Sequence, residues 1–562
     1  MKKIIVIAVA VPLLAVAAEE PDSRVRAIAA PERIVASSDG VGGAEFLCSP
    51  RFGQVAEGPF LNGNGPVLAK GGWIILDFGR ELHGSIQIGS GAKSGHGARV
   101  RVRFGESVSE AMSELGVKGA CNDHAIRDDV IALPWYGRRE FGESGFRFAR
   151  IDNAGDDPVQ LDYVRAVSLM RPMRRIGRFK SSDERLNAIF DTAVRTVHLC
   201  CQDYLWDGIK RDRLVWMGDT HPETMAVLAV FGAADVLPHS LDYMAATCPP
   251  DAWMNGMPTY TLWWIRNLAE WYRYTGDLKY LRGHAEYLSK TFAHVRTGMR
   301  GGRWLAGTFL DWPTEHNKEA AAAGTQALAL ICARETAFLA RALGDAKLEA
   351  DASALAAELA RQKPEPHGAK SAAALLALSG MRSANEMFDG TLSKDGHDGV
   401  STFYGYYLLE AMSAAGETQR ALDTVRDYWG GMLDMGATTF WEDFSLAWTN
   451  GAFRVDQMPV AGMKDIHGDY GEFCYKGFRH SLCHGWSAGP APWMIANVLG
   501  IRPVGVGCRE FEVKPSLGDL DWAEGAYALP DGGAVEVRVS KKPDGTLDVK
   551  VNAPAKVSVR TL

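Results

Sequence analysis

Residues 181–197 read SSDERLNAIFDTAVRTV, and the periodicity of the chain changes in this stretch. Its apolar side chains recur three or four positions apart, which is the spacing of one helix face. These side chains are Leu186, Ile189, Phe190, Ala193, Val194 and Val197. The preceding Ser181-Ser182-Asp183-Glu184 can form a capping box at the start of a helix. The stretch therefore predicts the first element of a helical region.

Helical spacing continues from this point towards residue 500. One helix is predicted from Thr261 to Tyr274, ended by Gly276-Asp277, and another around residues 328–339, ended by Gly344-Asp345. At about 25 to 30 residues for each helix and its loop, the region holds roughly a dozen helices. Helices without intervening strands suit a closed ring of helical hairpins, and an open solenoid is the alternative.

On both sides of the helical region, apolar and polar residues alternate with a period of two. In residues 98–104, valine and phenylalanine alternate with arginine, as on a strand with one buried and one wet face. Near the C-terminus, Val535, Val537 and Val539 alternate with polar residues, and Pro543-Asp544-Gly545 turns the chain into a further strand. Both flanks are predicted to be antiparallel β-sandwiches.

The N-terminus contains the segments of a signal peptide in their usual order. Lys2 and Lys3 precede an apolar run over residues 4–16, and small residues place a cleavage site after Ala17. The run is shorter than the ~20 residues that a membrane-spanning helix needs. We therefore expect a secreted or periplasmic protein without a membrane span.

Composition narrows the partners and the cofactors. The 562 residues carry a net charge of −7 with no basic run, which disfavours nucleic acid as a partner. The nine cysteines are odd in number and show no zinc-binding C-x-x-C spacing, so no metal is predicted from them, and any disulfide pairing stays open.

Residues 206–219, WDGIKRDRLVWMGD, form the densest polar segment, and His221 and Glu223 follow closely. Carboxylates, basic side chains and tryptophans together suit a sugar site, because acids transfer protons and bind hydroxyl groups while indole faces pack on the C–H face of a sugar ring. A salt-bridged surface loop is the alternative interpretation.

Three further clusters combine acids, histidines and aromatic residues. They are residues 436–444 (GATTFWEDF), 481–489 (SLCHGWSAG) and 309–316 (FLDWPTEH). Glu442 beside Trp441 is an acid in an apolar run, an environment that tunes catalytic carboxylates. Taken singly, each cluster suits a structural role as well as a functional one. Gly485-x-Ser487-x-Gly489 has the spacing of a nucleophile elbow, but it lies in helical territory, which disfavours a serine hydrolase.

In this order the clusters resemble glycoside hydrolase family 78, the α-L-rhamnosidases. The family motif D-C-P-Q-R-D-E-R-L-G-W-T-G-D is similar to residues 206–219, T-T-x-W-E to residues 438–442, and S-L-x-H to residues 481–484. The likeness also reaches residues 76–79 and residues 511–515 and 522–525, so that it covers nearly the whole mature chain.

The resemblance implies a fold and its boundaries. We expect a signal peptide over residues 1–17, an N-terminal β-sandwich region over 18–175, an (α/α)6 toroid over 176–502 and a C-terminal β-sandwich over 503–562. The resemblance also implies a six-hairpin glycosidase that works with carboxylates and needs no metal or cofactor.

The resemblance also implies the chemistry and the residues that perform it. An inverting enzyme uses one carboxylic acid to protonate the leaving oxygen and one carboxylate to activate water. Glu442 matches the general base. The implied contacts to a terminal α-L-rhamnose, on a polysaccharide or glycoside, are Asp207, Arg211, Asp219, His484, Trp216 and Trp441, and the fourth cluster adds Asp311 and Trp312 as substrate-binding candidates.

The general acid is where this chain departs from the family. The family acid is the Glu of R-D-E-R, whereas this chain reads Arg211-Asp212-Arg213, one residue shorter. Asp212 is the first candidate to supply the proton, and Glu223 is the second. The missing Glu leaves two alternative functions open: a related six-hairpin glycosidase with another sugar specificity, or a sugar-binding homologue that has lost catalysis.

Overall fold

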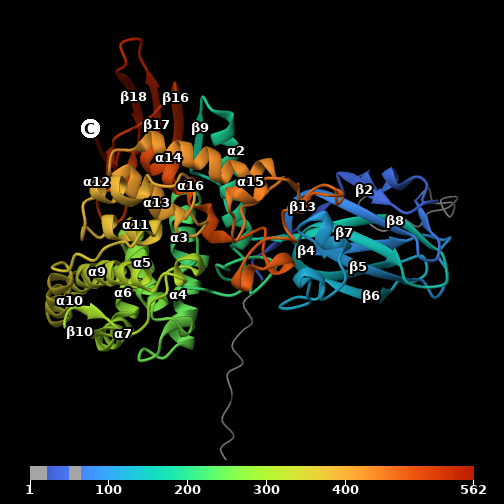
Figure 1. Cartoon of the computed structure of the whole chain (residues 1–562), viewed down its shortest axis with the longest axis horizontal. Helices are drawn as coiled ribbons and strands as arrows, with labels where there is room; N and C mark the ends of the chain where they lie inside the picture. The colour runs from blue at the N-terminus through green and yellow to red at the C-terminus, as the bar shows by residue number, and fades with distance from the viewer. Residues whose placement is uncertain (1–21, 50–64) are drawn as a thin grey trace, which may run out of the picture.

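The computed structural model describes residues 22–49 and 65–562, in which a β region, a helical region and a second β region follow one another (Figure 1). The predicted signal peptide lies outside the described residues. Within the described part of the chain, no helix is both long enough and apolar enough to span a bilayer.

The N-terminal β region is one sheet of eight strands with the order β1-β8-β4-β7-β5-β6, to which β2 adds on β4 and β3 on β8. All of its pairings are antiparallel. The strands are β1 Val25–Ala29, β2 Arg33–Ser37, β3 Val67–Leu68, β4 Trp73–Ser90, β5 Arg99–Gly105, β6 Asp128–Ala132, β7 Arg138–Asn153 and β8 Val159–Met170.

The predicted alternation in β5 holds for its apolar side and fails at one arginine. Val100, Val102 and Phe104 are buried, as expected. Arg103, expected on the wet face, is also buried, because its guanidinium pairs with Asp152 at 3.0 Å and with Glu114 at 3.0 Å. Ion pairing with neighbouring strands and loops removes it from water, which periodicity alone does not reveal.

The helical region extends from α2 to α16. The expectation of helices without intervening strands is wrong, because the region includes two short strand pairs: β10 Met299–Arg300 with β11 Arg303–Trp304, and β12 Ala452–Phe453 with β13 Lys464–Asp465. Its helices are α2 Glu184–Cys200, α3 Thr220–Val230, α4 Val236–Thr247, α5 Pro258–Thr275, α6 Leu278–Gly283, α7 Ala285–Thr297, α8 Trp312–Glu315, α9 Lys318–Leu343, α10 Ala346–Leu359, α11 Lys370–Leu378, α12 Ala384–Met387, α13 Gly405–Ala414, α14 Thr418–Thr424, α15 Gly430–Asp434 and α16 Pro490–Trp493. A short helix, α1 Val108–Met112, precedes them after β5.

The predicted helix ends are confirmed at α5 and α9, where Gly276 and Gly344 adopt positive φ angles of 69° and 74°. The capping box predicted before α2 is wrong. Asp183 caps this helix instead, and its carboxylate accepts hydrogen bonds from the backbone N–H groups of Arg185 and Leu186. A carboxylate at the N-cap satisfies the same orphan donors that the box would have served.

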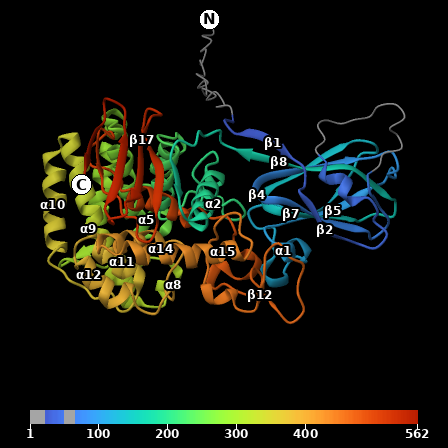
Figure 2. The same cartoon turned by 90° about the horizontal axis from the view of Figure 1, so that it is seen from above.

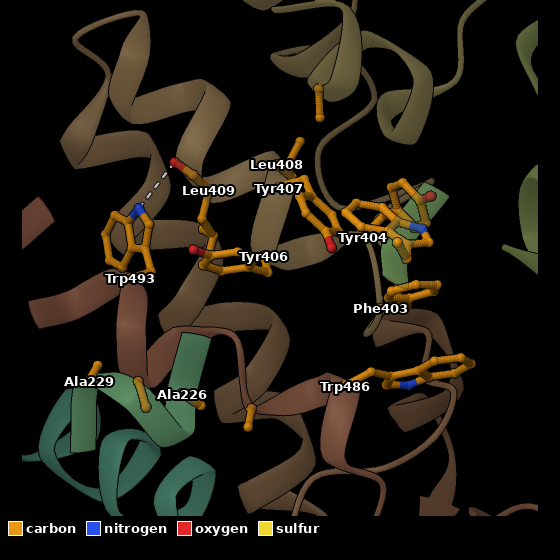
Figure 3. Packing of buried hydrophobic residues seen from close by; sticks show 14 of the residues in the cluster. Ala226, Ala229, Phe403, Tyr404, Tyr406, Tyr407, Leu408, Leu409, Trp486 and Trp493 are labelled. Carbon is orange, nitrogen blue, oxygen red and sulfur yellow. Dashed lines mark hydrogen bonds between the residues drawn. The ribbon is translucent and has the colours of Figure 1, made fainter. Parts of the chain in front are cut away.

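Large aromatic residues fill the core of the helical region (Figure 3). Phe403 and Trp486 stack with ring centroids 4.7 Å apart, and the indole N–H of Trp493 donates to the carbonyl of Leu409 at 3.1 Å. The indole N–H of Trp486 donates to the carbonyl of Glu442 at 3.0 Å, so both of these rings hold loops to helices as well as burying apolar area.

The C-terminal β region contains two sheets. One has the order β14 Ile501–Pro503, β15 Glu510–Val513 and β19 Ser558–Thr561, and the other joins β16 Trp522–Ala528, β17 Ala534–Lys541 and β18 Leu547–Asn552 to β9 Arg178–Ser181. The predicted hairpin between β17 and β18 is confirmed. The β15–β19 pair is parallel, an exception to the antiparallel pattern that we expected. Strand β9, directly before α2, pairs with β16 and so joins the start of the helical region to this sheet.

The N-terminal sheet meets the helical region beside α1 and α15 (Figure 2). The backbone N–H of Val108 donates to the carbonyl of Val455 at 2.9 Å across this junction. Arg147 of β7 pairs with Asp77 of β4 at 2.8 Å and donates to the carbonyl of Gly436 at 3.0 Å. Because buried charges make these contacts, the two regions meet along a polar and specific junction.

All nine cysteines lie in the described residues, and each is a free thiol. Cys332 is fully buried in α9.

Candidate functional site

Three loops that are far apart in the sequence converge at the candidate site. They are the segment between α2 and α3, the segment after α15, and the segment before η10 Gly485–Ala488. Gly208 and His484 form an antiparallel bridge, and the N–H of Gly485 donates to the carbonyl of Asp207 at 2.8 Å. The N–H of Glu442 donates to the carbonyl of Ser481 at 2.9 Å. The first three predicted clusters are therefore joined by backbone hydrogen bonds.

Glu442 is buried with both carboxylate oxygens occupied. Its Oε1 lies 2.8 Å from Nη2 of Arg211, and its Oε2 accepts the N–H of Ser481 at 3.0 Å. Burial raises the pKa of Glu442, while the positive charge of Arg211 and the Ser481 N–H oppose the rise. A carboxylate held in this way has the properties of a positioned base.

His484 stands among three carboxylates. Its Nε2 lies 3.7 Å from Asp207, 3.8 Å from Asp219 and 3.7 Å from Glu442. Burial and then the charge of Arg211 hold the pKa of His484 well below its usual range, so the imidazole is neutral. Its ring packs on Trp486 with centroids 4.2 Å apart.

The pKa values of Asp207 and Asp219 both lie well above the usual range. Burial is the main cause for each, and Asp212 and Asp219 add to the shift of Asp207. The hydroxyl of Tyr260 donates to Oδ2 of Asp219 at 2.9 Å and opposes part of its shift. Like charges this close oppose one another's ionisation, so both the burial and the neighbouring carboxylates favour the protonated forms.

Asp212 lies at the edge of this group. Its Oδ1 is 3.0 Å from Nη1 of Arg211 and 3.4 Å from Nε2 of His124, and its side chain is 20% exposed. Asp212 and Arg213 have φ angles of 56° and 55°, a backbone conformation that residues other than glycine rarely adopt. Asp212 faces a cavity of about 250 Å³ whose other lining residues are Arg24, Glu143, Asp203, Trp206 and Arg213.

Glu223 lies in the first turn of α3 and is fully buried. Neither of its carboxylate oxygens has a hydrogen-bond partner among the described residues. Burial, with Asp219 and Asp207 nearby, raises the pKa of Glu223 well above its usual range. A Cβ on Gly485 would stand 1.7 Å from its Oε1, so a larger residue at this position would require the Glu223 side chain to move.

The three tryptophans that were predicted to contact the substrate differ in how exposed they are to solvent. Trp216 is half-buried and meets the ring of Tyr260 edge-on at 5.9 Å. Trp312 is also half-buried, 5.2 Å from Phe309 and 5.4 Å from Phe473. Trp441 is only 1% exposed and packs edge-on against Phe444.

Asp311 has a local structural partner for each oxygen. Its Oδ1 accepts the N–H of Thr314 and caps α8, and its Oδ2 accepts the hydroxyl of Ser401 at 2.7 Å. The structure therefore brings Asp207, Arg211, Asp219, Glu442 and His484 together. It places Asp212 at their edge and Glu223 beneath Gly485.

Sequence reasoning missed several contributors to this group. Tyr260, Trp486, Thr402 and the N–H of Ser481 contact the predicted residues. Trp486 follows His484 by two positions, so the motif itself could have indicated it. Tyr260 comes from α5 and carries no local signal.

One group among the described residues could hold a metal ion: Glu106, Glu110 and His467, all buried. The ammonium of Lys210 lies 3.0 Å, 3.3 Å and 3.5 Å from these three side chains. A side-chain cation therefore already stands between the acceptors, and the group does not fit a resident metal.

A cavity of about 430 Å³ lies away from the candidate site, between the helices and the C-terminal β region. None of the predicted site residues lines it. Its charges pair with one another, as in Arg273 with Glu335 at 2.6 Å and Arg266 with Glu270 at 2.9 Å.

Two family models match the chain. Residues 174–369 match the bacterial alpha-L-rhamnosidase six-hairpin glycosidase domain, and residues 500–561 match the bacterial alpha-L-rhamnosidase C-terminal domain. No curated protein sequence matches the chain.

Solved rhamnosidase structures resemble the chain over most of its length. The family 78 rhamnosidase of Bacillus sp. GL1 has a TM-score of 0.72 and 21% identity, covering 89% of this chain and 53% of that one. A rhamnosidase from Klebsiella oxytoca with rhamnose bound has a TM-score of 0.66 and 19% identity, covering 84% and 96%. The Streptomyces avermitilis α-L-rhamnosidase complexed with L-rhamnose has a TM-score of 0.69 and 19% identity, covering 88% and 50%. The chain spans about half the length of the Bacillus and Streptomyces proteins.

The helical region between two β regions, with carboxylates gathered at its loops, has a fold similar to that of solved rhamnosidases, which are glycosidases. Its two matched domains are those of bacterial α-L-rhamnosidases, and the resemblance to glycoside hydrolase family 78 is confirmed.

Proposed function

We propose that this chain is an exo-acting, inverting glycoside hydrolase that releases terminal α-L-rhamnose from a polysaccharide or glycoside. The observation that carries the proposal is Glu442, a buried carboxylate whose two oxygens are held by Arg211 and the Ser481 N–H. A base in this state can take a proton from water once a sugar closes the site. Rhamnose in two of the similar structures supports the choice of sugar.

The surrounding residues take the roles that the motifs suggested. Asp207, Asp219 and His484 would bind sugar hydroxyl groups beside Arg211, since protonated carboxyls and a neutral imidazole can each donate or accept. Trp216 and Trp312 offer accessible aromatic faces to the sugar ring and its methyl group. Trp441 is buried and would support Glu442 from below. Asp311 would act mainly by holding Trp312 in place.

Asp212 stays the first candidate for the general acid. Its side chain is partly exposed and shares Arg211 with Glu442, so a leaving oxygen can approach it. Burial raises the pKa of Glu223, which favours the protonated form of an acid, but the side chain is enclosed beneath Gly485. It would need a shift of the loop to reach a substrate, and it is the second candidate.

The proposal extends to the arrangement of the whole chain. The helices would close into an (α/α)6 toroid between β-sandwiches, with boundaries near residues 175 and 502. The chain would be exported after cleavage of residues 1–17 and would work without a cofactor.

The missing family Glu favours one second candidate function, a sugar-binding protein without catalysis. Incubation with an aryl α-L-rhamnoside and a panel of rhamnose-containing polysaccharides separates the two. Turnover with release of β-L-rhamnose, followed by NMR, supports the hydrolase. Binding of L-rhamnose without turnover supports the binding protein, and turnover of another aryl glycoside alone indicates a different sugar.

A further inference from the structure

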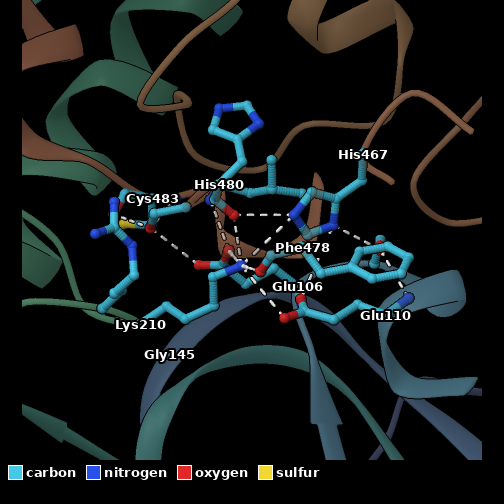
Figure 4. Close-up of polar contacts among 12 residues, drawn as sticks. Glu106, Glu110, Gly145, Lys210, His467, Phe478, His480 and Cys483 are labelled. Atoms are coloured by element: carbon cyan, nitrogen blue, oxygen red, sulfur yellow. Dashed lines mark hydrogen bonds and ion pairs between the residues drawn. The ribbon is translucent and has the colours of Figure 1, made fainter. Parts of the chain in front are cut away.

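A buried group of charges lies at the junction of the N-terminal sheet and the site loops (Figure 4). The ammonium of Lys210 contacts Glu106 Oε2 at 3.0 Å and Glu110 Oε1 at 3.3 Å, and it donates to the carbonyl of Phe478 at 2.9 Å. The Lys210 side chain is 4% exposed and both glutamate side chains are 0% exposed. Such an ammonium needs all of these acceptors, because an unpaired buried charge is strongly destabilising.

The two glutamates share Lys210 but differ in their other partners. Glu110 has a second cation, Arg127, within ion-pair distance. Glu106 pairs with Lys210 and also accepts hydrogen bonds from Ser481 and Leu482. Glu106 directly follows β5, so a residue of the N-terminal sheet region reaches into the helical region.

Glu106 and Glu442 hold adjacent peptide groups. The N–H of Leu482 donates to Glu106 Oε2 at 2.6 Å, and the neighbouring N–H of Ser481 donates to Glu442 Oε2 at 3.0 Å. The hydroxyl of Ser481 also donates to Glu106 Oε1 at 3.3 Å. A displacement of this dipeptide would therefore move the donor on which one oxygen of Glu442 depends.

A second connection runs through the chain itself. Lys210 precedes Arg211, whose Nη2 holds the other oxygen of Glu442 at 2.8 Å. Fixing the Lys210 ammonium between Glu106 and Glu110 limits how far this part of the loop can move.

We propose that Glu106 is a positioning residue for Glu442. It holds the Ser481–Leu482 peptide directly and Arg211 through Lys210, so that both oxygens of the base keep their donors. Glu106 is buried and takes no part in the bond changes. The inference rests on the proposed function, and it makes the N-terminal sheet region a contributor to the chemistry of the helical one.

The test compares the full-length wild type with Glu106→Gln, Glu106→Ala and a matched control, Asp77→Asn. Asp77 is likewise buried at the same junction and paired with Arg147, but it does not contact Lys210, Ser481 or Leu482. Misplacement of a catalytic group by about 1 Å costs about 100-fold in rate. We expect kcat on an aryl rhamnoside to fall about 100-fold in Glu106→Ala. The fall should be smaller in Glu106→Gln, because glutamine keeps an oxygen that can accept the Leu482 N–H. KM should change less than threefold, and Asp77→Asn should keep the wild-type kcat.

Hydrogen exchange followed by mass spectrometry gives a readout that does not depend on turnover. Peptides covering residues 478–486 should exchange faster in Glu106→Ala than in the wild type or in Asp77→Asn. Unchanged exchange in this segment, or equal loss of kcat in Asp77→Asn, overturns the inference. An inactive wild type contradicts the proposed function instead, and the exchange data still decide whether Glu106 holds the peptide.

Discussion

Arg211 Nη2 lies 2.8 Å from Glu442 Oε1, although the two residues are 231 positions apart in the chain. The other terminal nitrogen of the same guanidinium lies 3.0 Å from Asp212 Oδ1. One arginine therefore contacts both the proposed base and the first candidate for the acid. Because the fork of a guanidinium is rigid, it fixes the relative position of these two carboxylates.

Replacing Arg211 should shift the pH dependence of the reaction. Burial already raises the pKa of Glu442, and the charge of Arg211 opposes that rise. Arg211→Gln removes the opposing charge, so the pKa of Glu442 rises further, and the acidic limb of kcat/KM should move to higher pH. Arg211→Lys keeps the charge and should shift the limb less. Identical limbs in the wild type and both variants would show that Arg211 does not tune the base.

Loss of the base should abolish most of the turnover without unfolding the protein. Glu442→Gln is expected to lower kcat by roughly two to four orders of magnitude, the usual contribution of a positioned acid or base. Glu472→Gln, an exposed acid of the same site region, is the control and should keep the wild-type rate. A folded Glu442→Gln variant with wild-type turnover would remove Glu442 from the mechanism.

The acid can be identified by its dependence on the leaving group. A general acid matters most when the leaving group is poor, so Asp212→Asn should damage cleavage of a natural glycoside far more than cleavage of an activated aryl rhamnoside. Glu223→Gln should show little such selectivity. The reverse pattern would assign the acid to Glu223, and no selectivity in either variant would mean that neither supplies the proton.

The stability of the protein should reveal the protonation state of Glu223. Its folded-state pKa lies well above the unfolded one because of burial. Between these two values the folded state binds the extra proton, so the free energy of unfolding falls as pH rises from about 4.5 towards the folded pKa. Glu223→Gln removes this slope and should be more stable than the wild type at pH 7, with the difference shrinking near pH 4.5. Thermal or urea unfolding at the two pH values measures it, and a constant difference would contradict the assignment.

Activity should survive chelation of divalent ions. Inverting hydrolysis needs two carboxylic groups and no Lewis acid. The Glu106, Glu110 and His467 group is already filled by the Lys210 ammonium. Turnover lost in a chelator and restored by one divalent ion would mean that a metal takes part.

The candidate site illustrates how far the motifs could be interpreted without a structure. Asp207, Arg211, Asp219, Glu442 and His484 do lie together, because the family motifs carry information about contacts that a single sequence does not state. Trp441 and Asp311 show the limit. The indole is enclosed by Phe444, and the carboxylate caps α8, and neither fact is visible in the residue types around them.

Periodicity in the sequence alone determined where strands give way to helices, where α5 and α9 end, and that β17 and β18 form a hairpin. These features depend on side chains a few positions apart, so local spacing is enough to predict them. The tertiary structure alone decided that β9 joins the C-terminal sheet and that Arg103 is buried. It also decided that Glu223 has no hydrogen-bond partner in the described part of the chain and that Glu106 reaches Leu482. Their physical reason is the same: burial and ion pairing depend on groups brought together by folding over hundreds of residues, and the free energy of a charged side chain is set by those distant neighbours.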